Sequence, residues 1–311
     1  MRDLVRESSL SPTDLVLPMF VQDGIDSPVD IKSMPEMRRL PIKDIAAEAS
    51  SAADLGIPAI MLFGIPTTKD DIGSAAYEDK GAIQQAISSI RSVLGEKIVV
   101  MADVCLCQYT LSGHCGLEKN GKIDNDSSLT TLARIAVSQA DAGVNVVSPS
   151  AMMDGQVATI RSALDDAGHE DVAIMSHSAK HRSSFYSPFR NAAECAPKFG
   201  DRKTYQVPYT NGREAISELQ ADYDEGVDML MIKPALAYLD LIAEAKRRFT
   251  TPIAAYSVSG EFALVKAASM QGWVNEDEIT HEILSSIKRA GADIIMTYFA
   301  KQVAQKLAEY R

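Results

Sequence analysis

Three of the four cysteines in this chain, Cys105, Cys107 and Cys115, lie within eleven residues. Two thiols at Cys-x-Cys spacing and a third across a turn can occupy three corners of a tetrahedron, the geometry that zinc prefers. Three protein ligands leave a fourth position open, as in catalytic zinc sites. The alternative is three buried free thiols, but the segment is rich in Gly, Ser and Thr and is typical of a loop. The pattern therefore predicts a catalytic zinc site. The fourth cysteine, Cys195, stands alone and has no assigned role.

Two lysines each end a strongly apolar run. Lys180 closes Ile174–Ala179, and Lys233 follows Met229–Ile232 directly. An ammonium group near apolar walls or a second cation has a lowered pKa. The neutral amine attacks ketones and forms a Schiff base. One lysine of this kind is more often a snorkelling side chain or an ion-pair partner, but two at successive strand ends favour catalysis.

A long segment separates Lys180 from the next predicted helix. Residues 181–210 contain Arg182, Arg190, Arg202 and several aromatic residues. A loop of roughly thirty residues in a compact domain is usually a lid or a binding loop. Its arginines can bind a carboxylate through two parallel hydrogen bonds, and its aromatic rings can exclude water from a closed site. The alternative is a surface loop with solvated arginines.

These residues need a scaffold, and a repeated pattern indicates which one. Four times, an Ala-rich helical stretch ends in Gly and an apolar run follows. Gly is the usual residue just past a helix C-terminus, and apolar runs without alternation are typical of strands buried on both faces. The glycines are Gly56, Gly143, Gly226 and Gly291.

With further apolar runs between these copies, the sequence predicts eight strands alternating with helices. This order is typical of an α/β protein with a (β/α)8 TIM barrel, here one domain over residues 1–311. A doubly wound open sheet is the alternative, but no G-x-G-x-x-G follows the first strand. The predicted strands are 15–21, 57–63, 97–104, 144–147, 171–176, 229–232, 252–257 and 293–296, and the clearest helices are 42–55, 82–94, 129–141, 213–223 and 277–289.

A barrel of this kind carries its functional side chains at the C-terminal ends of its strands. Polar and nucleophilic residues do gather there in the predicted arrangement. They are Asp103, Cys105, Cys107, Ser150, Lys180, Lys233, Ser259 and Tyr298.

The composition and charge of the chain argue against several classes of protein. The chain has 311 residues, 46% hydrophobic composition and a formal net charge of −11, which argues against nucleic-acid binding. No apolar run is long enough to cross a bilayer, and the first residues lack a signal-peptide core. Few, clustered cysteines suit a reducing compartment. We therefore expect a cytoplasmic protein without nucleic-acid or membrane partners.

Several motifs, in order along the chain, resemble the porphobilinogen synthase (5-aminolaevulinate dehydratase) family. The resemblance runs from about Arg6 to the C-terminus. The motifs are Asp103-Val-Cys-Leu-Cys107, Gly113-His-Cys-Gly116, Pro149-Ser-Ala-Met-Met-Asp-Gly155, Met175-Ser-His-Ser-Ala-Lys180, Phe185-Tyr-Ser-Pro-Phe-Arg190, Met231-Ile-Lys-Pro234 and Val258-Ser-Gly-Glu261.

The resemblance implies an activity. Two molecules of 5-aminolaevulinate would condense with loss of two waters to give porphobilinogen, an early step of tetrapyrrole (haem) biosynthesis. Lys180 and Lys233 would form the two Schiff bases. Zn²⁺ on the three cysteines would act as a Lewis acid, and Asp103 with Ser150 would assist proton transfer beside the amine of the acetate-side substrate.

The resemblance also implies how each substrate carboxylate is held. Ser259 and Tyr298 would bind the carboxylate of the propionate-side substrate on Lys233. Arg190 and Gln206 would bind that of the acetate-side substrate on Lys180. Arg202 is a second cation of the lid, and Phe185 belongs to the same substrate-binding set.

Three positions bear on metals and assembly. Thr204 stands where some family members have a cysteine for a second zinc, so that second site is not expected. Glu218 matches an allosteric Mg²⁺ ligand at a subunit interface of bacterial relatives, although a lone Glu on a helix is otherwise a solvated charge. The N-terminal arm, residues 1–14, is short for the family. A homo-octamer remains the expected assembly, with a hexamer or dimer as alternatives.

Two other functions compete with this one. A lysine-dependent aldolase of barrel fold would explain one lysine but not the three cysteines. A zinc-stabilised binding or assembly protein would explain the cysteines but not two lysines accompanied by carboxylate-binding residues.

Overall fold

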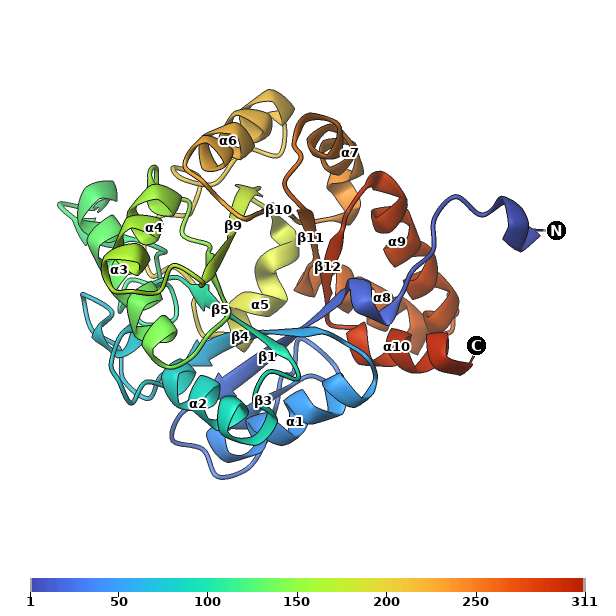
Figure 1. The fold of residues 1–311 in the computed structure, drawn as a ribbon, viewed down its shortest axis with the longest axis horizontal. Coiled ribbons are helices and arrows are strands. Elements are labelled where there is room, and N and C mark those ends of the chain that lie inside the picture. The colour runs from blue at the N-terminus through green and yellow to red at the C-terminus, as the bar shows by residue number, and fades with distance from the viewer. Residues whose placement is uncertain (1, 310–311) are drawn as a thin grey trace.

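Eight parallel strands close into a barrel in the computed structural model, which describes residues 2–309 (Figure 1). Each strand pairs with the next, and the last pairs with the first, so that Leu15 lies opposite Ile295. The predicted TIM barrel is therefore confirmed, and the open sheet is excluded. The strands are β1 (Leu15–Gln22), β4 (Ala59–Ile65), β5 (Val99–Val104), β8 (Val146–Pro149), β9 (Ala173–Lys180), β10 (Met229–Lys233), β11 (Ile253–Ser257) and β12 (Ile294–Thr297).

Helices surround the barrel on the outside (Figure 1). The predicted bounds of α2 agree with the structure, and its buried residues Ile83, Ile87 and Ile90 follow the helical repeat. The helices are α1 (Ile42–Asp54), α2 (Ala82–Leu94), α3 (Asn125–Asp141), α4 (Gln156–Asp166), α6 (Gly212–Asp224), α7 (Leu239–Arg248), α8 (Ser259–Met270), α9 (Glu276–Ala290) and α10 (Ala300–Glu309).

The strands are apolar throughout because both of their faces are covered. Every residue of β4 is buried, and so are all residues of β1 except Gln22. Side chains on one face fill the barrel, and those on the other pack under the helices. The four glycines of the repeated pattern all have positive φ, as expected just past a helix end.

Strand β9 is longer than predicted. It continues to Lys180, whereas the sequence indicated an end at Ser176. Its second half, with Ser176, His177 and Ser178, is polar yet fully buried, and this polarity hid the strand. A register irregularity in the pairing with β10 brings Lys180 directly opposite Lys233.

Shorter elements are inserted between the barrel units. The sequence did not indicate β2 (Val29–Asp30) and β3 (Arg38–Pro41) after β1, or the hairpin of β6 (Leu117–Lys119) and β7 (Lys122–Asp124) after β5, because such strands are too short to show a pattern. The segment 181–210 is not wholly irregular. It contains a 3-10 turn, η4 (Ser184–Tyr186), and α5 (Ser187–Ala192), which lies over the centre of the ring of strands in Figure 1.

The N-terminal residues extend away from the barrel (Figure 1). This segment holds two 3-10 turns, η1 (Arg2–Val5) and η2 (Pro12–Asp14), and an ion pair of 2.9 Å joins Asp14 to Lys288. Met1 of the predicted arm lies outside the described residues.

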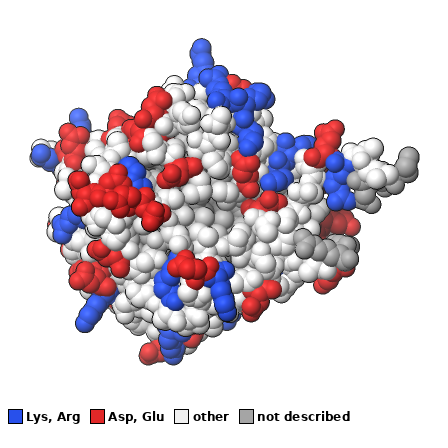
Figure 2. Space-filling view, in the orientation of Figure 1, with Lys and Arg blue, Asp and Glu red and all other residues white. Residues whose placement is uncertain are grey.

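On the face shown in Figure 2, acidic and basic side chains are spread around the periphery and the centre is largely uncharged. Within residues 2–309, no helix has the length and apolarity that crossing a membrane requires.

Candidate active site

Two lysines lie side by side at the C-terminal end of the barrel. Lys180 is the last residue of β9 and Lys233 the last of β10, and the two are paired in register. They are only 6% and 5% exposed, respectively. Two cations in so small and dry a space raise each other's electrostatic energy.

Lys233 sits among aromatic rings. Its Nζ lies 4.2 Å from the ring centroid of Tyr256, 5.3 Å from that of Phe189 and 5.5 Å from that of Tyr186. Burial, helped by the charge of Lys180, lowers the pKa of Lys233 to about 7. A large fraction of this amine is therefore neutral and nucleophilic near neutral pH.

Lys180 has more polar surroundings. Its Nζ donates to the carbonyl oxygen of Ser150, whose hydroxyl donates to Asp103 at 2.6 Å. Burial lowers the pKa of Lys180, but negative charge on Cys115 and Cys105 opposes this effect, and the net pKa is raised. The expectation of a lowered pKa therefore agrees for Lys233 but not for Lys180, because the charge of Lys180 adds to the effect of burial at Lys233, whereas the charges of Cys115 and Cys105 oppose burial at Lys180.

Asp103 is linked to Lys180 through Ser150. Its second carboxylate oxygen accepts a hydrogen bond of 2.9 Å from the Gln108 side chain. Burial raises the pKa of Asp103, and the charge of Lys180 and the hydrogen bonds from Ser150 and Gln108 only partly offset this. A buried carboxyl group whose pKa is raised is better able to act as a proton donor than an ordinary carboxylate.

The three predicted metal ligands converge. The Sγ atoms of Cys105, Cys107 and Cys115 all lie within 4.8 Å of one another and are buried. Hydrogen bonding from Cys105 and Cys107 holds the pKa of Cys115 well below its usual range. Three clustered thiols fit a soft or borderline divalent metal such as zinc.

Tyr298 and Ser259 lie at neighbouring strand ends. The hydroxyl of Tyr298 is 2.8 Å from that of Tyr256, whose ring faces Lys233. The hydroxyl of Ser259, in contrast, accepts from the Phe189 amide at 3.0 Å and donates to the Phe185 carbonyl at 3.2 Å. Main-chain groups of the 181–210 segment thus occupy Ser259 in this conformation.

Other residues of that segment have unused hydrogen-bonding groups. In the part of the chain that the structure describes, neither side-chain polar atom of buried Gln206 has a partner, and neither has Nε of Arg190. Such buried groups cost free energy unless a ligand or water meets them. Arg202 differs, because its guanidinium donates to the main-chain oxygens of Gly113 and Cys195.

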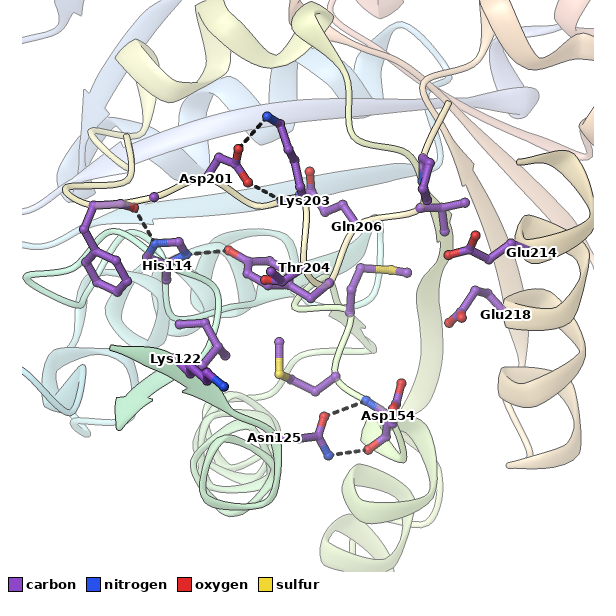
Figure 3. A pocket seen from close by; sticks show the side chains of 18 of the residues that line it. His114, Lys122, Asn125, Asp154, Asp201, Lys203, Thr204, Gln206, Glu214 and Glu218 are labelled. Atoms are coloured by element: carbon purple, nitrogen blue, oxygen red, sulfur yellow. Dashed lines mark hydrogen bonds and ion pairs between the residues drawn. The ribbon is translucent and has the colours of Figure 1, made fainter. Parts of the chain in front are cut away.

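A cavity of about 790 Å³ opens beside this region (Figure 3). Gln206 and Thr204 line it, and Glu218 projects toward it from α6, but the two lysines do not line it. His114, also in the wall, has Nδ1 2.9 Å from the Tyr205 hydroxyl and Nε2 2.9 Å from the Phe199 carbonyl. Both of its ring nitrogens are thus engaged by protein groups.

Residue spacing did not indicate a role in this region for two further side chains, His177 and Cys195. His177 is fully buried, and neither ring nitrogen has a partner within residues 2–309. Burial, with the charges of Lys233 and Lys180, holds its pKa well below the usual range. Cys195 lies beside Cys107, although the two are far apart in the chain. Both placements depend on tertiary structure, and no local pattern could have found them.

Comparison with known proteins decides the family. A sequence model of delta-aminolevulinic acid dehydratase matches residues 1–306. The chain belongs to the delta-aminolevulinic acid dehydratase family. A dehydratase of this name from Halalkalibacterium halodurans is 51% identical over 99% of this chain and 94% of its own length. One from Bacillus subtilis is 49% identical over 99% of this chain and 95% of its own length.

A solved dehydratase has the same fold. The crystal structure of delta-aminolevulinic acid dehydratase (porphobilinogen synthase) from Toxoplasma gondii, in complex with the reaction product porphobilinogen, has a TM-score of 0.97 to this chain. It is 40% identical, and the match covers 100% of this chain and 89% of that one. The chain is therefore an enzyme, a porphobilinogen synthase of the hydro-lyase class in tetrapyrrole biosynthesis, and neither an aldolase nor a binding protein.

Proposed function

We propose that this enzyme joins two molecules of 5-aminolaevulinate into porphobilinogen through Schiff bases on Lys180 and Lys233, with Zn²⁺ at the three clustered cysteines. The observation that carries the proposal is the pairing of the two buried lysines next to those thiols. Two ketone substrates need two amines, and holding both substrates in one site supplies a high effective concentration.

Lys233 is the amine prepared to react first. With its pKa near 7, it attacks the substrate ketone, and the resulting carbinolamine loses water to form an imine. The rings of Tyr186, Phe189 and Tyr256 exclude bulk water and favour this dehydration. We assign to Tyr298 and Ser259 the carboxylate of this propionate-side substrate.

Lys180 then holds the acetate-side substrate. Asp103 is placed to take a proton from the amine of this substrate and to return it to a leaving water, while Ser150 orients the carboxyl group. Zinc, when bound, supplies a Lewis acid beside that amine.

The 181–210 segment acts as the lid in this proposal. Arg190 and Gln206 receive the acetate-side carboxylate, which would satisfy their free hydrogen-bonding groups. Phe185 lines the site, and Ser259 becomes available when the lid backbone shifts. Arg202 is the second substrate-binding cation of the lid in this proposal, and its guanidinium also binds the main-chain oxygens of Gly113 and Cys195.

The proposal also covers the oligomeric state and the cellular location of the enzyme. We expect one TIM-barrel domain with residues 1–14 as an arm, a homo-octamer rather than a hexamer or dimer, and cytoplasmic localisation. Glu218 is proposed as a Mg²⁺ ligand that acts from outside the active site.

The test is porphobilinogen formation from 5-aminolaevulinate, with and without a chelator, followed by addition of zinc. Loss of activity on chelation and recovery with zinc support the complete proposal. Activity that persists while metal analysis shows no bound zinc would refute the metal role and keep the lysine chemistry. Failure to form porphobilinogen at any metal concentration would refute the proposal.

A further inference from the structure

A buried carboxyl group joins the segments that follow two neighbouring barrel strands. Glu261 lies in the first turn of α8 and is only 3% exposed. One of its oxygens accepts the amide of Leu236 at 2.7 Å, and the other accepts the amide of Val258 at 2.6 Å. Leu236 is the third residue after Lys233, and Val258 directly precedes Ser259. One side chain thus holds the main chain that follows β10 against the main chain that follows β11.

Other contacts fix the two segments that this carboxyl group joins. The carbonyl oxygen of Lys233 accepts hydrogen bonds from the His181 amide at 2.9 Å and from the Tyr186 hydroxyl at 3.0 Å. At the start of α8, a Cβ added to Gly260 would lie 2.5 Å from main-chain atoms of Phe185. Such close contacts leave little room for local displacement in a packed interior. The main chain at Lys233 and the start of α8 are therefore well-defined points of the active site.

Helix capping alone does not explain the burial of Glu261. A buried carboxyl group costs free energy even when it is hydrogen-bonded, and burial raises the pKa of Glu261 to about 7 although amide hydrogen bonds from Leu236 and Val258 oppose this shift. Helix α9 is capped at less cost, because its first turn is met by the exposed amide side chain of Asn275. What Glu261 adds to capping is the contact with Leu236 on the neighbouring segment.

We propose that Glu261 is a positioning residue that sets the separation of Lys233 and Ser259 and thereby selects keto acids of one length. Lys233 takes the ketone of the propionate-side substrate and Ser259 takes its carboxylate, so the two segments that Glu261 joins hold opposite ends of one molecule. A fixed separation suits a 4-oxo acid such as 5-aminolaevulinate and misplaces the ketone of a longer acid. This inference rests on the proposed function, because it requires the Schiff base on Lys233 and the carboxylate at Ser259.

Borohydride trapping on the zinc-loaded wild-type enzyme tests the inference first. The probes are 4-oxopentanoate, 5-oxohexanoate and 2-butanone, three methyl ketones with a carboxylate at the expected distance, a carboxylate one methylene further away and no carboxylate. Peptide mapping should show that 4-oxopentanoate is trapped on Lys233 roughly 10- to 100-fold more efficiently than the other two, since a misplacement of about 1 Å can cost on the order of 100-fold. Equal trapping of the two acids would overturn the inference and keep the proposed lysine chemistry. Trapping of none of the ketones on Lys233 would overturn both.

Variants of Glu261 then separate positioning from support of the fold. Glu261→Gln keeps the size of the side chain but turns an NH₂ group toward one of the two amides, and Glu261→Asp keeps the charge but is too short to meet both. Each should lower the preference for 4-oxopentanoate over 2-butanone by about tenfold and leave trapping of 2-butanone on Lys233 as in the wild type.

Asp228→Asn is the matched control. Asp228 also accepts a main-chain amide, that of Ile174 at 2.7 Å, but at the opposite end of β10 from Lys233. This variant should keep the wild-type preference. A preference that is unchanged in both Glu261 variants, or trapping that falls equally for both ketones, would overturn the positioning role.

Discussion

At the scale of single residues, the two lysine amines of the active site are chemically identical but differ in pKa because their surroundings differ. Aromatic walls and the charge of Lys180 lower the pKa of Lys233 to about 7, whereas thiolate charge raises that of Lys180. Lys233 is therefore the more nucleophilic of the two amines near neutral pH.

The low pKa of Lys233 gives a prediction for pH dependence. Neutral amine is the reactive form, so the initial rate of borohydride trapping of substrate on Lys233 should fall about tenfold for each pH unit below 7 and level off above it. Peptide mapping of the reduced adduct measures the trapping at each lysine. Lys233→Met should abolish the Lys233 adduct and leave the fold unchanged. A trapping rate that stays constant between pH 5.5 and 8 would contradict the assignment.

Two tyrosines allow a matched test of carboxylate binding. Tyr298→Phe should raise KM by roughly 10- to 100-fold, because a hydrogen bond to a charged group contributes roughly 1.5–3 kcal/mol. Tyr256→Phe removes the same 2.8 Å hydrogen bond between the tyrosines, but not the proposed contact with substrate. Steady-state kinetics of both variants distinguish the two roles. Equal effects on KM would show that Tyr298 acts through its hydrogen bond to Tyr256 and not through a contact with the substrate.

At the scale of elements, the sequence predicted the barrel well because burial on both faces leaves a local pattern. All eight predicted runs overlap barrel strands, and the positions of Lys233 and Tyr298 at strand ends followed from the fold class. The predicted strand at β9 ended too early, at Ser176, because the buried residues that follow are polar. Helix α5 is too brief to show a periodicity.

The contact between residues 181–210 and the loop that carries the three clustered cysteines can be tested by glycine substitutions. Gly113→Ala should lower the free energy of unfolding by roughly 2–4 kcal/mol, since it combines strain at positive φ with a collision against the lid. Gly121→Ala is the control, because Gly121 also has positive φ (+76°) but open space around it. Urea unfolding measures stability, and limited proteolysis of 190–205 measures lid docking.

Only Gly113→Ala should make the lid susceptible to protease and weaken zinc binding. Gly121→Ala should lose only the roughly 1–2 kcal/mol that the left-handed backbone conformation costs a residue with a Cβ. If both variants showed the same stability and the same proteolysis, the lid would not depend on its contact with the cysteine loop.

At the scale of the whole molecule, some parts of the site could not be predicted from the sequence because they depend on contacts between segments that are distant in the chain. Cys195 lies near Cys107 only because residues 181–210 fold back on the loop that carries the three clustered cysteines. His177 is buried only because β9 lines the barrel. The contacts of Arg202 with the main-chain oxygens of Gly113 and Cys195 also depend on this packing. Tertiary packing determines such partners, and the spacing of residues along the chain does not predict them.

Several acidic residues line the cavity that lies beside the active-site region, and the lysine pair is not part of its wall. Glu218 and Glu214 project from α6 toward the cavity of Figure 3, with Asp154 across from them. Burial, followed by the charges of Asp154, Asp222, Glu214 and Glu225, raises the pKa of Glu218 to about 7. A divalent cation would relieve this repulsion, and Mg²⁺ prefers carboxylate oxygens.

The raised pKa determines the sign of the pH effect. Folding favours the protonated form of Glu218, so its stabilising contribution is complete below the ordinary pKa of 4.5 and is lost as the pH rises through about 7. Mg²⁺ must displace that proton at low pH and binds without this cost above pH 7. Mg²⁺ should therefore stimulate activity and assembly more at pH 8 than at pH 6. Glu218→Gln should abolish this response, and Asp224→Asn, which removes a charge from the same helix outside the cluster, should retain it. Initial rates and sedimentation velocity measure the response, and an unchanged response in Glu218→Gln would place the Mg²⁺ effect elsewhere in the protein.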